Sequence, residues 1–131
     1  MPDYELKRTG LPPLRFHGEQ ITKASSDTGH SSVQRWYDAW TYRTDSGVWV
    51  ASVAYRSRWE GEHDRWVSFM ADDPAGLVAQ LADYDPVATL QGFPPGPHHA
   101  VRQERLRARL VADWAQCLQD LLDHEAFVQT L

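Results

Sequence analysis

The stretch that decides the fold is residues 35–59, which read RWYDAWTYRTDSGVWVASVAYRSRW. Its first part, up to Thr44, is rich in Trp, Tyr and Thr, the residues that favour extended strands. The polar segment that ends at Gly47 predicts a tight turn, because glycine readily adopts a positive φ. The alternation that resumes at Val48 and continues to Trp59 predicts a second strand, paired antiparallel with the first.

Both faces of this predicted sheet carry aromatic rings, because neighbouring residues on a strand point to opposite faces. Trp36 and Tyr37 are adjacent in the sequence and therefore cannot enter the same core. A helix packed on one face leaves the rings of the other face uncovered. We expect this second aromatic surface to be available to a partner or to a second copy of the chain.

The segments on either side extend this antiparallel pair. Residues 65–71 alternate apolar and polar side chains and predict a further strand. Towards the N-terminus, residues 14–17 begin a strand that residues 21–24 continue. We expect residues 1–13 to be a flexible lead-in, and the Ser-, Asp- and Gly-rich residues 25–33 to be a flexible loop.

Two helices follow the predicted sheet. Asp73 suits the N-cap and Pro74 the first turn of a short helix, which the Asp85-Pro86 pair ends. Beyond the stiff, proline-rich residues 92–97, an apolar stripe of helical spacing predicts a long helix. The stripe consists of Leu106, Leu110, Trp114, Cys117 and Leu121.

The predicted fold is α+β, with residues 1–131 forming a single domain. An antiparallel β-meander of four strands, with five as the alternative, precedes the short helix. The long C-terminal helix packs on the sheet. The residues that we expect in the core are Trp36, Trp40, Trp49, Tyr55, Phe69, Leu110, Trp114 and Leu121.

Composition narrows the function classes. The net charge of -5 and the pI of about 5.6 do not favour nucleic acid or anionic lipid over the chain as a whole. Cys117 is the only cysteine, which excludes an intrachain disulfide, fits a reducing compartment and predicts a buried thiol. No apolar run approaches the ~20 residues of a transmembrane helix, so we expect a cytoplasmic protein that has no membrane partner.

Arginines are the most prominent candidate site residues, because lysine occurs only at Lys7 and Lys23. Arginine amid Trp and Tyr on a sheet can hold phosphates while the rings stack on bases, and arginines along one helix face can meet a DNA backbone. The simpler interpretations are a GC-rich coding bias and a solvated surface balanced by acidic neighbours. The candidate nucleic-acid or partner-binding residues are Arg35, Arg43, Arg56, Arg58, Arg65, Arg102, Arg105 and Arg109.

The residues show no recognisable catalytic or metal-binding spacing, and we expect no catalytic residue, no metal and no cofactor. Glu60–Asp64 is an acidic turn that also contains a histidine. As the site of an enzyme, this turn would need to meet Arg35 or His17 in a cleft. His98 and His99 diverge by about 100° on a helix and are poorly placed to chelate one metal.

Part of the chain resembles a known family. The motifs that carry the resemblance are Arg35-Trp36, Tyr42-Arg43-Thr44, Gly47, Trp49-Val50, Trp59 and Gly61-Glu62-His63-Asp64-Arg65. They are similar to those of a family of small uncharacterised bacterial proteins that are often carried on plasmids and other mobile elements. The family has no assigned activity, so the resemblance implies an association with mobile elements and no functional residue.

A looser likeness exists to the Trp-Gly-Arg (WGR) domain of some DNA-damage enzymes, which is also an aromatic β-meander with a helix. At the position of the motif that names this domain, the chain has Arg58-Trp59-Glu60-Gly61. The likeness implies binding to DNA ends.

Three functional hypotheses follow. The first is a non-enzymatic binding or accessory protein that acts through a protein partner or as a homodimer, and it rests on the surplus of strand aromatics. Its variant is an inhibitor of a host defence protein, in which the negative charge imitates nucleic acid. The second is a nucleic-acid-associated accessory protein of a mobile element that uses the arginines, and the third is an enzyme that uses the Glu60–Asp64 turn.

Overall fold

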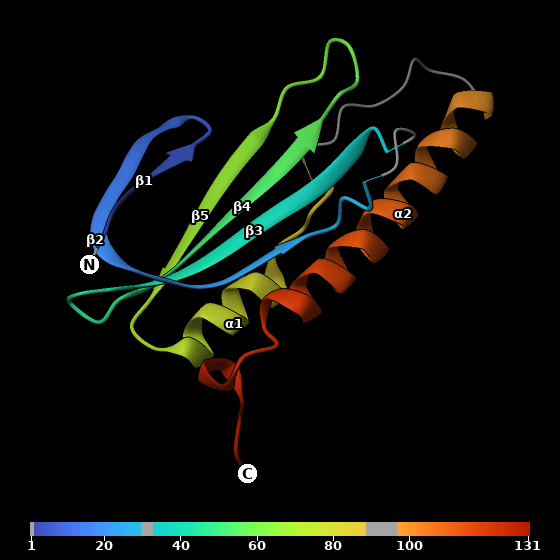
Figure 1. Ribbon diagram of the computed structural model, residues 1–131. Coiled ribbons are helices and arrows are strands. Elements are labelled where there is room, and N and C mark those ends of the chain that lie inside the picture. The colour runs from blue at the N-terminus through green and yellow to red at the C-terminus, as the bar shows by residue number, and fades with distance from the viewer. Residues whose placement is uncertain (1, 30–32, 89–96) are drawn as a thin grey trace.

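The computed structural model describes residues 2–29, 33–88 and 97–131. It confirms the α+β fold, a curled antiparallel meander of five strands followed by a short helix and a long C-terminal helix (Figure 1). In their order across the sheet, the strands are β1 (Asp3–Arg8), β2 (Leu11–Ser25), β3 (Arg35–Thr44), β4 (Trp49–Ser57) and β5 (Arg65–Ala71). The helices are α1 (Pro74–Asp83), α2 (Pro97–Leu121) and the short 3-10 helix η1 (Glu125–Phe127).

Strand β1 and the start of β2 correct the expectation that residues 1–13 are a flexible lead-in. Tyr4 and Leu6 alternate with charged residues, which is the period of a strand, and Gly10 turns the chain into β2 with a φ of 80°. The Pro12-Pro13 pair is tolerated because this part of β2 has a strand partner on one side only.

Some expectations fall partly outside the described residues. These are residues 30–32 of the loop expected at 25–33, residues 92–96 of the proline-rich connector, and the side chain of His98. The described start of the loop is tied to β3, because the Ser26 backbone N–H donates to the carbonyl oxygen of Tyr37 at 2.8 Å.

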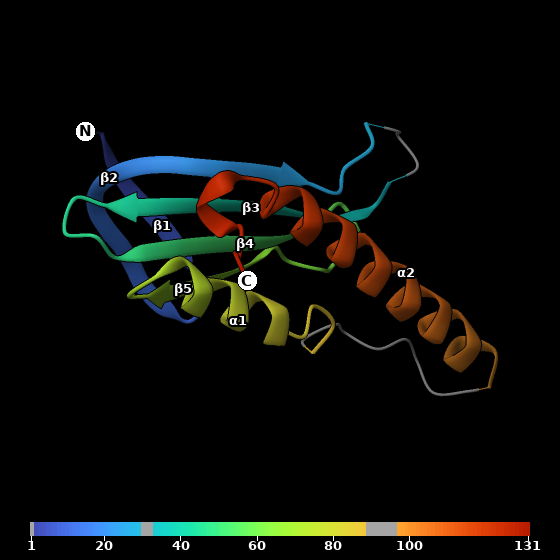
Figure 2. The same cartoon turned by 90° about the horizontal axis from the view of Figure 1, so that it is seen from below.

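Strand β2 pairs first with β1 and then with β3, and it changes partner at Gly18. Residues 11–17 pair with β1, and residues 18–25 pair with β3. A Cβ on Gly18 would lie 2.3 Å from the carbonyl oxygen of Arg43 and 2.9 Å from the Cα of Thr44, so only glycine permits this approach of the two backbones. The β1–β2 hairpin consequently turns and lies across the other strands (Figure 2).

The sheet has a packed cluster on each face. Helices α1 and α2 cover one face, and the fully buried side chains there include Tyr37, Val53, Leu77, Leu81, Leu110 and Leu121. The β1–β2 hairpin covers part of the opposite face, where Leu6 packs with Tyr42 and Val50. The ring of Tyr4 lies 4.7 Å from the ring of Tyr42. One sheet is therefore buried on both sides by elements of its own chain.

Of the eight expected core residues, six belong to the cluster under the helices, Trp40 packs against the cluster under the hairpin, and Trp36 belongs to neither. Trp36, Tyr55, Leu110, Trp114 and Leu121 are buried, whereas Trp40, Trp49 and Phe69 are partly buried. The expectation that the helix-free face stays open is wrong for the half that the hairpin covers. The covering hairpin contains strand β1, whose residues were expected to be a flexible lead-in. The wrong expectation of an open face therefore follows from the missed strand.

Strand β5 has a protected outer edge. The Trp66 backbone N–H donates to Thr9 Oγ1 at 2.8 Å, and the Thr9 N–H donates to the Trp66 carbonyl oxygen at 2.9 Å. Further along, Gln80 of α1 donates to the carbonyl oxygen of Met70 at 2.7 Å. These contacts block the addition of another strand at those points.

The expected N-cap of α1 is confirmed, since Asp73 accepts a hydrogen bond from the Gly76 N–H at 2.7 Å.

Within the described ranges, no helix has both the length and the apolar character needed to cross a membrane.

A Gly18→Ala substitution tests the bend in β2. We expect it to cost about 3 kcal/mol of unfolding free energy, because the new Cβ meets backbone that cannot move aside. Gly47→Ala is the control: its φ is 88° but no atom lies within 4 Å of an added Cβ, so it should cost about 1 to 2 kcal/mol. Urea unfolding measures both, and equal costs would contradict the close approach at Gly18.

Candidate functional site

The candidate arginines do not form one surface. Arg35 lies on the helix-covered face at the start of β3, and Arg43 is exposed near the opposite end of the same strand. Arg56 lies on the helix-free face, and Arg65 lines a pocket of about 350 Å³ beside the edge of β5. Arg102, Arg105 and Arg109 are exposed on α2.

Arg56 and Arg58 cover the ring of Trp36 on the half of the helix-free face beyond the hairpin. Their guanidinium carbons lie 5.8 Å and 4.6 Å from the centre of this ring, so cation–π attraction holds them there. Trp36 is consequently buried although no helix lies on it.

Acidic side chains balance the charge of these two arginines. Arg56 Nε lies 2.9 Å from Asp64 Oδ2 and Arg56 Nη1 lies 3.4 Å from Asp38 Oδ2. Arg58 Nη2 lies 3.8 Å from Asp27 Oδ2. This part of the face therefore offers paired charges rather than free cations.

Arg35 makes a buried ion pair with the acidic turn between β4 and β5. Its Nε donates to Glu62 Oε1 at 2.9 Å, and both side chains are less than a tenth exposed. The same carboxylate oxygen accepts a hydrogen bond from the hydroxyl of Tyr55 at 2.7 Å. The turn thus meets Arg35, as the enzyme hypothesis requires, but it does so in a closed contact rather than in a cleft.

The protein environment fixes the protonation states of this network. Burial alone would raise the pKa of Glu62, but hydrogen bonds from Ser57, Tyr55 and Arg35, together with the Arg35 charge, hold it below its usual value. Burial first, and the bond to Glu62 second, raise the pKa of Tyr55 well above its ordinary value. At neutral pH the network is a carboxylate held between a guanidinium and a neutral phenol.

The same ion pair fixes the loop of residues 58–64, on which Trp59 is presented. The ring of Trp59 lies 5.0 Å from the guanidinium carbon of Arg35. Trp59 is nevertheless 51 % exposed to solvent. The Arg58 N–H donates to the Gln34 carbonyl at 2.8 Å, and the Ser57 N–H donates to Asp64 Oδ1 at 3.0 Å. Hydrogen bonds at both ends of the loop therefore hold the segment that carries the exposed indole.

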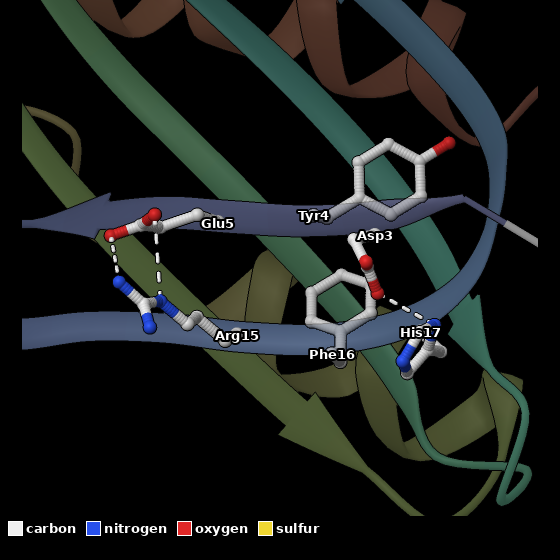
Figure 3. Close-up of a pocket in the computed structure, with 6 residues that line it drawn as sticks. All are labelled: Asp3, Tyr4, Glu5, Arg15, Phe16 and His17. Atoms are coloured by element: carbon white, nitrogen blue, oxygen red, sulfur yellow. Dashed lines mark hydrogen bonds and ion pairs between the residues drawn. The ribbon is translucent and has the colours of Figure 1, made fainter.

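A second hollow of about 590 Å³ lies on the β1–β2 hairpin (Figure 3). His17 Nδ1 lies 2.6 Å from Asp3 Oδ1, and Arg15 Nε lies 3.5 Å from Glu5 Oε2. All four side chains are exposed, and each charged group is already paired across the hairpin. His17 therefore pairs with Asp3 and not with the Glu60–Asp64 turn.

Other groups with chemical potential are buried. Cys117 is buried as expected, and burial, with the charges of Asp38 and Asp120, raises the pKa of its thiol to about 12. Burial likewise raises the pKa of Tyr37, whose hydroxyl donates to the Pro86 carbonyl at 2.8 Å. In the described part of the chain, no three His, Cys, Asp or Glu side chains gather in a way that could hold a metal ion.

Sequence reasoning named Arg35 and the acidic turn but missed the exposure of Trp59. The alternation of β4 continues on paper to Trp59, whereas the strand ends at Ser57. The sequence predicts the turn that contains Gly61, whose φ is 83°, but this turn does not show that β4 already ends at Ser57.

No family model, curated protein or solved structure shows significant similarity to this chain. The resemblance to proteins of mobile elements therefore stays a prediction, and the function is argued from the geometry of the site.

Glu62→Gln tests whether the ion pair supports the loop. It leaves Arg35 buried without a counter-charge, so we expect a loss of about 3 kcal/mol in unfolding free energy. The matched control is Glu5→Gln in the exposed pair with Arg15, which should cost no more than about 1 kcal/mol. Urea unfolding measures both variants. If Glu62→Gln lowers the unfolding free energy as little as Glu5→Gln does, the Arg35–Glu62 pair is not buried.

The pH dependence of stability gives an independent check. Because the folded pKa of Glu62 lies below the ordinary value of 4.5, its carboxylate contributes stability above that pH and loses it as the pH falls through the folded pKa. The unfolding free energy of the native chain should therefore fall more steeply with acidification than that of Glu62→Gln. Parallel curves in urea titrations below pH 5 would contradict the pKa direction.

Proposed function

We propose that the chain is a non-enzymatic binding protein that engages a protein partner through the loop around Trp59. The observation that carries this proposal is the half-exposed indole of Trp59 above the buried Arg35–Glu62 pair. Tryptophan and arginine are the residues most enriched at the energetic centres of protein interfaces. An anchor that is already ordered also costs less conformational entropy when it binds.

The surroundings of Trp59 fit a polar rim. Arg58, Glu60 and His63 are exposed on the same loop as the indole, and Arg58 and Glu60 carry opposite charges. The partner that suits this surface has an apolar pocket for one indole, bordered by polar groups.

An enzymatic role has less support from the geometry. Glu62 is fully engaged by its donors, and the pKa values of Tyr55 and Cys117 are raised, which keeps both groups protonated at neutral pH. None of these groups is poised to exchange a proton near pH 7. Binding of nucleic acid by the sheet surface likewise has less support, because Arg35, Arg56 and Arg58 are paired with carboxylates.

The test compares Trp59→Ala with Met70→Ala, which truncates a side chain of similar exposure, 48 %, on β5. Tagged native protein captures a partner, the partner is identified and purified, and the Kd is measured for each variant. We expect Trp59→Ala to weaken binding by at least roughly tenfold, as a central anchor does, and Met70→Ala to leave it nearly unchanged.

Thermal unfolding of both variants checks that each remains folded, since loss of the cation–π contact with Arg35 should cost only about 1 kcal/mol. Equal affinities for the native chain and Trp59→Ala would contradict the proposal. So would binding of mixed DNA or RNA that declines steeply with salt, because this outcome would favour the nucleic-acid hypothesis.

A further inference from the structure

Helix α2 has an outer face that nothing in the described chain covers. The residues of this outer face follow one another at intervals of four and three and are Val101, Arg105, Ala108, Ala112, Ala115 and Gln119. All of them are exposed, and they lie opposite the buried side formed by Leu110, Trp114 and Cys117. The outer face is apolar or small at most of its positions, and Val101 is 53 % exposed.

The N-terminal half of α2 projects beyond the strands of the sheet (Figure 2). None of the side chains of residues 99–109 is fully buried, and Leu110 is the first buried residue among the described side chains of the helix. Helices gain most of their stability from packing, and short unsupported segments are marginal in water. Packing against a further element would therefore stabilise the projecting half of the helix.

All basic residues of α2 lie in its N-terminal half, together with Glu104, whereas Asp113 and Asp120 lie in its C-terminal half. Arg102 and Arg105 are exposed in the N-terminal half and make no ion pair with any described residue. The last turn has no basic residue and contains Asp120, on the same flank of the helix as Arg102. A negative charge at the C-terminal end opposes the helix macrodipole, so this distribution does not serve the isolated helix.

We infer that two copies of the chain pack antiparallel through the outer face of α2. In antiparallel helices the same flank of each meets its counterpart, so the arginines of one copy face Asp120 of the other. A two-fold axis that passes between residues 112 and 113 brings Arg105 opposite Asp120 of the second copy, and the pair occurs twice. Ala108, Ala112 and Ala115 lie along the contact and allow the two helices to approach closely.

The self-complementary charges favour a second copy over an unrelated partner. A two-fold contact uses the same surface on both subunits, which requires each surface to contain both halves of every pair. The outer face of α2 meets this condition, because its basic and acidic ends are on one flank of one helix. Each projecting N-terminal half would then lie along the better-supported C-terminal half of the other copy.

A charge swap tests this contact. Light scattering and sedimentation measure the dimer dissociation constant for the native chain, for Arg105→Glu, for Asp120→Arg and for the double variant. Each single variant should weaken the dimer by at least roughly tenfold, because it places like charges together twice. The double variant should recover most of the native affinity, and Arg43→Glu, at an exposed site outside α2, should have no effect.

A cysteine cross-link checks the register. Ala112→Cys should form a disulfide-linked dimer on mild oxidation, because the axis passes beside this residue, whereas Ala82→Cys on the exposed side of α1 should not. Trp59→Ala should leave the dimer unchanged, which separates this contact from the proposed partner site. A native chain that is monomeric at all accessible concentrations, or a double variant that fails to recover, would overturn the inference.

Discussion

The close contact between the backbone of Gly18 and that of Arg43 and Thr44 is the constraint on which the rest of the structure depends. It lets one long strand pair with β1 in its first part and with β3 in its second part. The β1–β2 hairpin then covers half of the face that the helices leave open. A meander of five strands thereby buries aromatic residues on both of its faces, which a flat sheet with helices on one side cannot do.

The other half of that face is covered by charged side chains of β4 and of the loop that follows it. Arg56 and Arg58 lie on the ring of Trp36, and aspartates balance their charges. Together the hairpin and the arginines leave little of the strand aromatics exposed. Among the aromatic residues that the structure describes, Trp59 is the one that is exposed, and it belongs to a loop rather than to the sheet.

Much of the fold could be predicted from local patterns. Strands β3 and β5 begin and end where the alternation and the turn residues place them, and α1 has its expected cap at Asp73. Strand β1 was missed because the Pro12-Pro13 pair and several charges obscured the alternation of Tyr4 and Leu6. The tertiary contact that gives this strand its role depends on Gly18, whose close neighbour Arg43 is far away in the sequence.

The candidate site was less predictable, because its chemistry depends on which charges meet. The sequence contains enough aspartate and glutamate to pair with the sheet arginines, but it does not say that Glu62 folds back to Arg35 while His17 pairs with Asp3. The charge pattern of α2 was visible as a basic stripe. The role proposed for Asp120 could not be predicted, because the sequence does not show which side of the helix remains exposed.

The most direct test of this account is a proton–proton NOE spectrum of the native chain. With Tyr4 and Tyr42 ring centres 4.7 Å apart, the bend at Gly18 predicts cross-peaks between these rings, and further ones between Leu6 and Val50. Cross-peaks within the β1–β2 hairpin, without any from the hairpin to β3 or β4, would contradict it. In that case the aromatic face beneath the hairpin would be open, and the partner surface would have to be sought there instead of at Trp59.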